Sequence, residues 1–351
     1  MLQYLLSQDT LIFVNLTMNI NKPFIIAEIG GNHEGSIKYA KKLLIDAARA
    51  GADAVKFQTY FPEKIVSRVE DYDRYKHFSK FSLPIENYFE LADLAKENNV
   101  LFMSSIWDAE SLKSLNSLIK IHKIGSGDLT NIPLIKKILD TKKPLIISTA
   151  MASLKEIQET VSCIYEYDNL YRDPNMLAIL QCVAMYGNPK DEYANLLCIP
   201  ELKNTFPYAT IGYSDHTIGN YAANLSFALG AEILEVHFTD NKDQEFRDHH
   251  ISVTASELQS LKENINKTLS MLGSAKKEPI KDIETPERII EFRRACYLKK
   301  DLAKGEIISS DILTTLRPCK GIDAKDYEKL IGKKLRVDKK AFSSIFWNEI
   351  E

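Results

Sequence analysis

The chain has 351 residues, which exceeds one average domain and suits a large domain followed by a small one. Hydrophobic residues make up 45% and charged residues 26% of the chain, which excludes a largely disordered protein. The formal net charge of −3 excludes a general attraction to nucleic acid or to anionic membranes, so an anionic ligand must be held by local basic groups.

Residues 1–17 have neither a cationic start nor a small-residue cleavage site, so we predict an N-terminal extension rather than a signal peptide. Two origins stay open for this extension: a start codon upstream of Met18, or a short strand pair that closes the floor of the domain that follows. No apolar run reaches the ~20 residues that a bilayer requires. The five cysteines are scattered without CxxC spacing, which predicts reduced thiols in a cytoplasmic protein.

From residue 24 onward, short β-prone apolar runs alternate with helical periodicity. The first unit is a strand at 24–30 followed by a helix from about residue 36 to residue 50. Seven further strands, each with a plausible helix behind it, are expected at 54–58, 100–105, 121–126, 144–149, 176–182, 209–214 and 232–238. Intervening helices predict parallel pairing, because parallel neighbours need a long crossover connection. Eight units over about 250 residues predict an α/β fold, a closed (β/α)8 TIM barrel spanning 18–273.

A doubly wound open sheet is the alternative to this barrel. Its glycine fingerprint, GxGxxG after the first strand, is absent, because the chain reads GGNHEG at 30–35. We therefore favour the barrel and keep the open sheet as the second possibility.

A lysine-rich stretch with two prolines, SAKKEPIKDIETPE at 274–287, follows the last predicted helix and indicates an exposed linker over 274–290. Residues 291–351 contain short β-prone runs and turns, which predict a small β-rich module. A module of about 60 residues has a small core and would gain stability by docking on a larger body.

Polar side chains gather at the carboxyl ends of the predicted strands, where barrels carry their active sites. Nearly every strand contributes to this set, which comprises Glu28, Lys56, Gln58, Ser104, Ser105, Asp108, Lys123, Ser126, Asp128, Ser148, Thr149, Gln181, Tyr186, Ser214, Asp215, His216, Glu235 and His237. A single member would be read as a satisfied polar group at the rim, but eight coincidences weaken that interpretation. Lys56 and Lys123 predict recognition of phosphate or carboxylate, since an ammonium in an apolar run is costly unless an anion neutralises it.

His216 and His237 end adjacent predicted strands, close enough to share a divalent cation, and Glu235 points to the same side as His237. Two imidazoles leave coordination positions open, at which a metal could polarise a carbonyl and activate water. Two rim histidines bonded to the backbone are an equally acceptable interpretation. His249 and His250, beside Asp248, offer further candidates, although adjacent histidines in a loop are more often solvent-exposed than ligands.

Six segments, taken in order, resemble the sialic acid synthase family of nonulosonate synthases. They are AEIGGNHEGS (27–36), AGADAVKFQT (50–59), HKIGSGDLTNIPLI (122–135), KPLIISTAMASLKEI (143–157), IGYSDHTIGNYA (211–222) and ALGAEILEVHFT (228–239). A seventh, KKDLAKGEIISSDILTTLRPCKGI (299–322), resembles the family's C-terminal antifreeze-like (SAF) domain. The resemblance implies that phosphoenolpyruvate is condensed with an N-acyl amino hexose, N-acetylmannosamine or a bacterial diacetamido relative, to a nine-carbon sialic-acid-type sugar with release of phosphate.

The resemblance also implies roles for individual residues. A metal, Mn²⁺ or alternatively Mg²⁺ or Co²⁺, would be held by His216 and His237, which together with Glu28 and Glu235 would form the catalytic set. Phosphoenolpyruvate would be bound by Lys56, Gln58, Lys123, Ser126, Ser148 and Tyr186. The sugar would be contacted by Tyr213, Asp248 and Arg317. A domain-swapped homodimer is implied too, in which Arg317 serves the barrel of the partner subunit.

Some positions depart from the family pattern. Val183-Ala184 replaces a hydroxyl or amide pair before a tyrosine, so part of the usual contact to the donor phosphate is missing. Phe246-Arg247 and Cys319 change sugar-facing loops, which suggests an acceptor other than plain N-acetylmannosamine. Two alternatives stay open: a phosphoenolpyruvate-dependent synthase of seven- or eight-carbon sugar acids, disfavoured by the C-terminal module, and a catalytically silent sugar-binding homologue, disfavoured by the retained lysines and histidines.

Overall fold

The computed structural model describes residues 23–244 and 248–351. The chain divides into two compact units, one ending at Gly273 and the other running from Ser274 to Glu351. The predicted extension at 1–17 lies outside the described residues.

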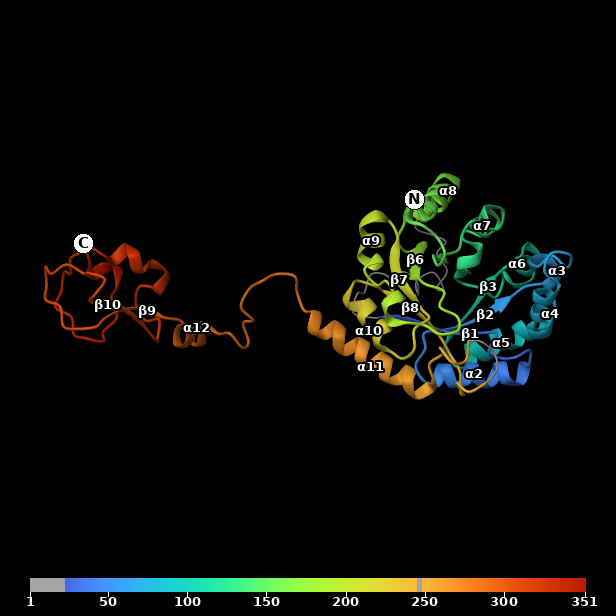
Figure 1. Cartoon of the computed structure of the whole chain (residues 1–351), viewed down its shortest axis with the longest axis horizontal. Coiled ribbons are helices and arrows are strands. Elements are labelled where there is room, and N and C mark those ends of the chain that lie inside the picture. The colour runs from blue at the N-terminus through green and yellow to red at the C-terminus, as the bar shows by residue number, and fades with distance from the viewer. Residues whose placement is uncertain (1–22, 245–247) are drawn as a thin grey trace, which may run out of the picture. The chain divides into compact units, whose positions relative to one another are not determined.

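Eight parallel strands close into a barrel in the first unit (Figure 1). They are β1 (Phe24–Gly30), β2 (Ala54–Thr59), β3 (Leu101–Ile106), β4 (His122–Ile124), β5 (Leu145–Ser148), β6 (Leu177–Cys182), β7 (Thr210–Asp215) and β8 (Ile233–His237). Strand β1 pairs in parallel with both β2 and β8, which closes the cylinder. The predicted (β/α)8 barrel is thereby confirmed, and the open sheet is excluded.

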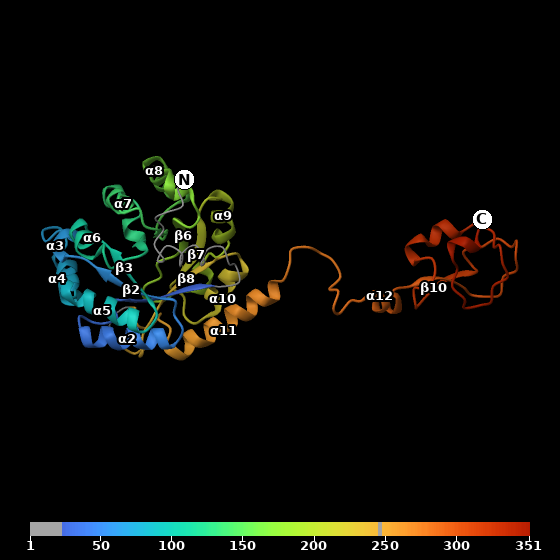
Figure 2. The ribbon, with the colours of Figure 1, turned by 180° about the vertical axis from the view of Figure 1, so that it is seen from behind.

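Helices surround the strands on the outside of the barrel (Figures 1 and 2). They are α2 (Ile37–Arg49), α3 (Pro62–Ile65), α4 (Tyr72–Phe81), α5 (Ile85–Glu97), α6 (Ala109–Leu115), α7 (Ile132–Leu139), α8 (Leu154–Tyr167), α9 (Cys198–Thr205), α10 (Tyr221–Ala228) and α11 (Ala255–Leu272). Helix α2 shows why these segments are helical: Ser36 caps its first turn, and its buried residues recur at helical spacing toward the sheet. The main core lies between strands and helices, and a smaller apolar cluster fills the barrel interior.

Two local features differ from the expected pattern. The strand expected over 121–126 ends at Ile124, because Ser126–Asp128 forms a 3-10 turn in which the Asp128 N–H donates to the Gly125 carbonyl. Between β2 and α5 the chain inserts the short helices α3 and α4 instead of passing directly into one helix. Pro62 begins α3, and the Asp71 side chain caps α4, so each start carries an ordinary helix signal.

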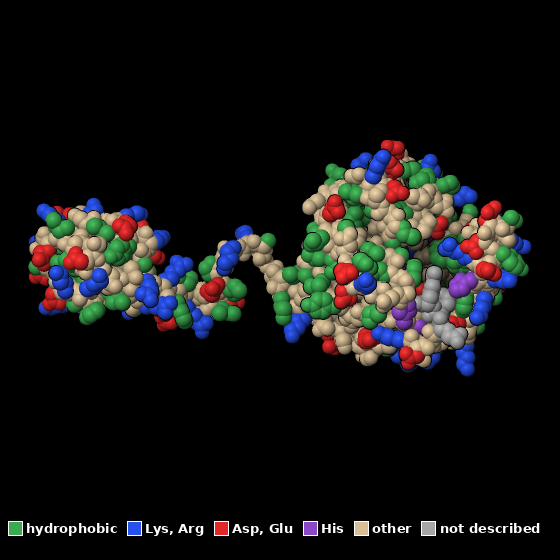
Figure 3. All heavy atoms as spheres, viewed as in Figure 1, with side chains coloured by type: hydrophobic (Ala, Val, Ile, Leu, Met, Phe, Trp, Pro, Cys, Tyr) green, Lys and Arg blue, Asp and Glu red, His purple; other side chains and the backbone are tan. Residues whose placement is uncertain are grey.

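The second unit has its own apolar core, built from residues such as Cys296, Leu298, Ile308 and Ile345. It contains α12 (Pro286–Phe292) and an antiparallel pair, β9 (Ala295–Leu298) and β10 (Leu313–Leu316). Isolated bridges and 3-10 turns at Ala324–Leu330 and Trp347–Glu349 complete it. On the face shown in Figure 3, side chains of both charges are interspersed over this unit. Within the described ranges of both units, no helix is long and apolar enough to cross a membrane.

Candidate active site

A cavity of about 770 Å³ lies at the mouth of the barrel, where the carboxyl ends of the strands meet. Its lining includes the strand-end residues Glu28, Lys56, Gln58, Ser105, Lys123, Ser126, Ser148, Tyr186, Ser214, His216, Glu235 and His237. Such a volume lies in the range of small-molecule sites. The strand order therefore brings together side chains that are far apart in sequence.

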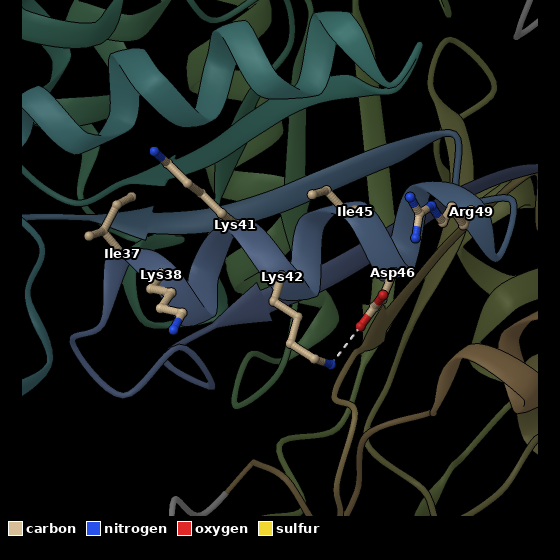
Figure 4. A pocket seen from close by; sticks show the side chains of 7 residues that line it. All are labelled: Ile37, Lys38, Lys41, Lys42, Ile45, Asp46 and Arg49. Atoms are coloured by element: carbon tan, nitrogen blue, oxygen red, sulfur yellow. Dashed lines mark hydrogen bonds and ion pairs between the residues drawn. The ribbon is translucent and has the colours of Figure 1, made fainter.

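A second depression, of about 510 Å³, lies on the outer surface of α2. Figure 4 shows its lining of Lys38, Lys41, Lys42, Asp46 and Arg49 with two isoleucines on one helix, and Lys42 is paired with Asp46 at 2.8 Å. Its charged groups are solvent-exposed lysine and arginine side chains that are partly neutralised by neighbouring carboxylates. We therefore place the candidate active site in the barrel mouth.

Lys56 forms the centre of a buried ion-pair network in that mouth. Its Nζ lies 2.7 Å from Glu28 Oε2 and 3.6 Å from Glu235 Oε2, and it donates to Ser105 Oγ at 2.9 Å. The sheet register places Glu28 directly beside Lys56, which accounts for the closer ion pair. Burial by itself lowers the pKa of Lys56, but the two carboxylates outweigh it and hold this pKa above its usual value. Lys56 is therefore a charged ammonium.

Lys123 lies on the other side of Glu235. Its Nζ is 3.8 Å from Glu235 Oε1, and it donates to Ser148 Oγ at 2.5 Å. Burial lowers the pKa of Lys123, and Glu235 opposes this effect only in part. Two lysines thus share one carboxylate, an arrangement that an anionic ligand can enter by competing with Glu235.

The pKa values of the two carboxyl groups, Glu28 and Glu235, are shifted in opposite directions. Burial raises the pKa of Glu28, and the ion pair with Lys56 offsets this only in part. Burial also acts to raise the pKa of Glu235, but Lys123 and Lys56 outweigh it, so this pKa lies below its usual value. Paired groups with diverging pKa values are typical of acid and base assignments, with Glu28 the more readily protonated of the two and Glu235 the ionised carboxylate.

The two imidazoles at the ends of β7 and β8 face each other across the cavity wall. The ring centroids of His216 and His237 are 5.0 Å apart, and both residues are buried. Tyr186 packs edge-on against His216, and Cys182 Sγ lies 3.7 Å from its Nδ1. Among residues 23–244 and 248–351 there is no group of three or more His, Cys, Asp and Glu side chains arranged to hold a metal ion. The site therefore offers at most two imidazole ligands from His216 and His237, and other positions of a bound cation would be left to substrate or water.

Asp248 is held in place by hydrogen bonds between the loops that follow β1 and β8. Asn32 donates through Nδ2 to Ser252 Oγ and to the Phe238 carbonyl, both at 2.9 Å. Ser252 in turn donates to the Asp248 carbonyl at 2.6 Å. The charge of Asp248 contributes to raising the pKa of His216, so the carboxylate lies within electrostatic reach of that ring.

Most residues expected in the site meet in the cavity, but none of the three expected sugar contacts, Tyr213, Asp248 and Arg317, is among the residues that line it. Tyr213 packs in the core between strands and helices, and its hydroxyl donates to Asp215 Oδ1 at 3.2 Å. The reason is strand alternation, which turns Tyr213 away from the side that carries Ser214. Arg317 belongs to the second unit, where its Nε donates to the Phe292 carbonyl at 2.6 Å. The altered Phe246-Arg247 pair lies outside the described residues.

The cavity also contains residues to which the sequence interpretation gave no specific role. Ser105 and Ser214 hold Lys56 and Glu235 through hydrogen bonds, and their signal was the serine at each strand end. Arg74, Phe78 and Trp107 line the cavity as well. Arg74 and Phe78 come from the inserted helix α4, and no strand-end pattern could have indicated them.

Comparison with known proteins yields two family matches. The model described as "NeuB family" matches residues 43–277, and the one described as "SAF domain" matches residues 293–351. The two matches together cover most of both units.

Individual relatives extend over nearly the whole chain. N,N'-diacetyllegionaminic acid synthase of Campylobacter jejuni is 37% identical over 327 residues, which cover 90% of this chain and 96% of the relative. The protein of the same name from Legionella pneumophila is 34% identical over 342 residues, with coverage of 93% and 94%. The crystal structure of N-acetylneuraminic acid synthetase from Leptospira borgpetersenii is 32% identical, covers 76% of this chain and 90% of its own, and superposes with a TM-score of 0.70.

Proposed function

The chain belongs to the NeuB family and carries a SAF domain at its C-terminal end, and from that premise we propose that it condenses phosphoenolpyruvate with an N-acyl amino hexose to a nine-carbon nonulosonic acid. The family resemblance expected from the sequence is thus confirmed, and the chain is a synthase of the nonulosonate type. The observation that carries the proposal on the donor is the buried set of Lys56, Glu235 and Lys123 beside two imidazoles.

The donor is a small molecule with a phosphate and a carboxylate, and the cavity floor suits both groups. Lys56 and Lys123 are nearly inaccessible to solvent, so their charges act on a bound anion with little screening. Ser126 and Ser148 supply hydroxyl groups, and the Ala150 N–H already donates to Ser126 Oγ at 3.0 Å. Val183 and Ala184 provide no hydroxyl or amide there, so the lysines carry more of the phosphate binding.

In the proposed reaction, C3 of phosphoenolpyruvate forms a bond to the aldehyde carbon of the open-chain sugar, water adds to C2, and phosphate leaves by cleavage of its C–O bond. Glu28, whose pKa burial raises, supplies a proton to the aldehyde oxygen. Glu235, ionised between two lysines, accepts a proton from the water that adds to C2. The floor of the cavity orients both substrates, which converts a two-body encounter into one oriented step.

A divalent metal, Mn²⁺ in the first place or Mg²⁺ or Co²⁺, would be held by His216 and His237 and would polarise the aldehyde carbonyl when bound. Asp248, positioned through Asn32 and Ser252, would contact sugar hydroxyl groups. Tyr213, whose hydroxyl donates to Asp215 within the core, is not proposed as a sugar contact.

Arg317 is proposed to complete the site from a second copy of the chain, in a domain-swapped homodimer. Its guanidinium is oriented by the Phe292 carbonyl, and the Cys319 N–H donates to the Ile290 carbonyl at 2.7 Å, so the loop and α12 form one piece. A mixed dimer tests this arrangement: chains with Arg317→Ala are combined with chains with Lys123→Met. Recovered activity supports shared sites, and a mixture as inactive as its parents speaks against them.

The decisive experiment measures phosphate release from phosphoenolpyruvate with a panel of acceptors and a divalent metal. The panel comprises N-acetylmannosamine, its 6-phosphate, a 2,4-diacetamido-2,4,6-trideoxyhexose, and pentose and tetrose phosphates. Turnover with an N-acyl hexose supports the proposal. Turnover with the pentose or tetrose phosphates alone would assign a shorter sugar-acid synthase, and no metal-dependent release with any acceptor would indicate a silent homologue.

A further inference from the structure

A sulfur atom contacts one ring nitrogen of His216. Cys182 Sγ lies 3.7 Å from His216 Nδ1, within hydrogen-bond distance for a sulfur partner. Cys182 is the last residue of β6, and the sheet register pairs it with Ser214, two residues before His216. Cys182 and His216 are both buried, and both line the cavity. The contact therefore follows from the pairing of β6 with β7.

The neighbours of Cys182 leave this ring nitrogen to the sulfur. Gln181 turns to the other side of the strand, where its Nε2 donates to the Asn195 carbonyl at 3.4 Å. Val183 and Ala184 have no polar side-chain atom. The sulfur of Cys182 is thus the hydrogen-bonding side-chain atom that this stretch directs at the imidazole.

The backbone around His216 is fixed separately, by Asp215. The Asp215 Oδ1 atom accepts hydrogen bonds from the Thr217 N–H at 2.8 Å and from the Tyr213 hydroxyl at 3.2 Å. One carboxyl oxygen therefore joins residues on both sides of His216. These bonds fix the backbone but leave the ring free to turn, because the terminal χ2 torsion of histidine is broad and roughly two-fold. A contact on the ring itself is needed to select the nitrogen that points into the cavity.

The sulfur contact supplies this selection. A neutral imidazole carries its proton on one nitrogen and a lone pair on the other, and a metal binds the lone pair. When Nδ1 of His216 carries the proton and donates it to the sulfur, Nε2 keeps the lone pair. A hydrogen-bond partner on the second nitrogen is the usual means by which proteins orient a metal-binding histidine.

We propose that Cys182 is a positioning residue of the metal site, whose sulfur accepts a hydrogen bond from His216 Nδ1 and thereby presents Nε2 to the divalent cation. Cys182 acts through His216 and is not a third ligand, since the described parts of the chain hold no group of three such side chains arranged around a metal position. This inference rests on the metal site of the proposed function and deepens it.

The test measures Mn²⁺ binding to the metal-free, full-length protein without substrates, from the electron paramagnetic resonance signal of unbound Mn²⁺. Cys182→Ala is expected to raise the Kd roughly 10-fold, at the lower end of the range for such partners because sulfur is a weak acceptor. Cys182→Ser loses the same sulfur but keeps a hydroxyl acceptor, so we expect it to recover part of this loss. The difference between the two variants isolates the hydrogen bond from the packing of the sulfur.

Cys198→Ala is the matched control. Cys198 begins α9 in the same unit and does not line the cavity, so its removal is expected to leave the Kd for Mn²⁺ unchanged. Thermal unfolding of the metal-free proteins checks that all variants fold. A Kd of Cys182→Ala equal to that of wild type, or serine and alanine variants of equal Kd, would overturn the inference alone.

Co²⁺ in place of Mn²⁺ provides a second, spectroscopic measurement. We expect no charge-transfer absorption from a thiolate to the metal, because the sulfur contacts the ring and not the cation. A charge-transfer band that Cys182→Ala abolishes would make Cys182 a ligand and overturn its positioning role. A wild-type protein that binds neither metal would overturn the metal assignment of the proposed function as well.

Discussion

Acid sensitivity of the barrel is predicted from a buried histidine. His33 is 2% exposed, and its Nδ1 accepts a hydrogen bond from the Gly35 N–H at 3.0 Å. Burial lowers the pKa of His33 from 6.5 to about 4. His33 therefore binds a proton near pH 6.5 in the unfolded chain but only near pH 4 in the folded protein. The free energy of unfolding is unaffected by this group above pH 6.5 and decreases as the pH falls from 6.5 toward 4.

The magnitude follows from the width of that interval. Each pH unit corresponds to about 1.36 kcal/mol, so the full interval corresponds to roughly 3.4 kcal/mol and the part above pH 5 to roughly 2 kcal/mol. His33→Asn keeps an acceptor for the Gly35 N–H but cannot be protonated. We expect the stability of this variant relative to wild type to increase by about 2 kcal/mol between pH 7.5 and pH 5.

Urea unfolding followed by circular dichroism at both pH values measures the effect, and groups that titrate equally in both proteins cancel in the difference. His122 provides an independent check, since it is buried at the start of β4 and burial lowers its pKa to about 3. His122→Asn should show a similar shift, and the two effects should add, because His33 follows the carboxyl end of β1 whereas His122 lies at the amino end of β4. A His33→Asn difference that does not depend on pH would refute the reasoning.

Three further outcomes are expected. Lys56→Met leaves two buried carboxyl groups without their shared cation and should lower the free energy of unfolding by about 3–5 kcal/mol. Adding Glu28→Gln should recover part of this loss, because it removes one of the two carboxyl groups. A loss below about 1 kcal/mol in urea unfolding would contradict the buried ion pair. Gly212→Ala would bring a Cβ to 2.5 Å from the Ile233 carbonyl oxygen, so β7 and β8 must shift, and a melting temperature equal to wild type would show that they need not. His216→Ala and His237→Ala should each abolish Mn²⁺ binding in isothermal titration, and unchanged affinity would remove the metal assignment.

The barrel could be predicted because the same pattern of a strand followed by a helix recurs along the sequence. Each strand reads as a short apolar run, and Lys56 and Lys123 stood out because each interrupts such a run with a charge. The cavity floor follows directly from these strands, since closure brings their ends to one place. The partner of each charge was harder to predict: Glu235 is shared by two lysines only because β8 returns beside β1.

What sequence reasoning could not predict depends on side-chain direction and on insertions. Tyr213 was expected at the sugar, but strand alternation places it in the outer core. Arg74 and Phe78 come from α4, an insertion with ordinary helix signals and no chemical motif, and they reach the cavity through tertiary packing with Trp107.

The order of residues along β2 has an evolutionary consequence. Lys56 is inside the strand, Gln58 is near its end, and Tyr60 is the first residue of the loop. A lysine inside the strand is bound to the register of the whole sheet, so a change there disturbs the fold, whereas loops accept insertions and substitutions. On the proposed function, exchange of the segment between β2 and α5 would alter the cavity lining while Lys56 and the other strand residues of the proposed donor site are retained. One barrel can in this way give rise to synthases for many different amino sugars.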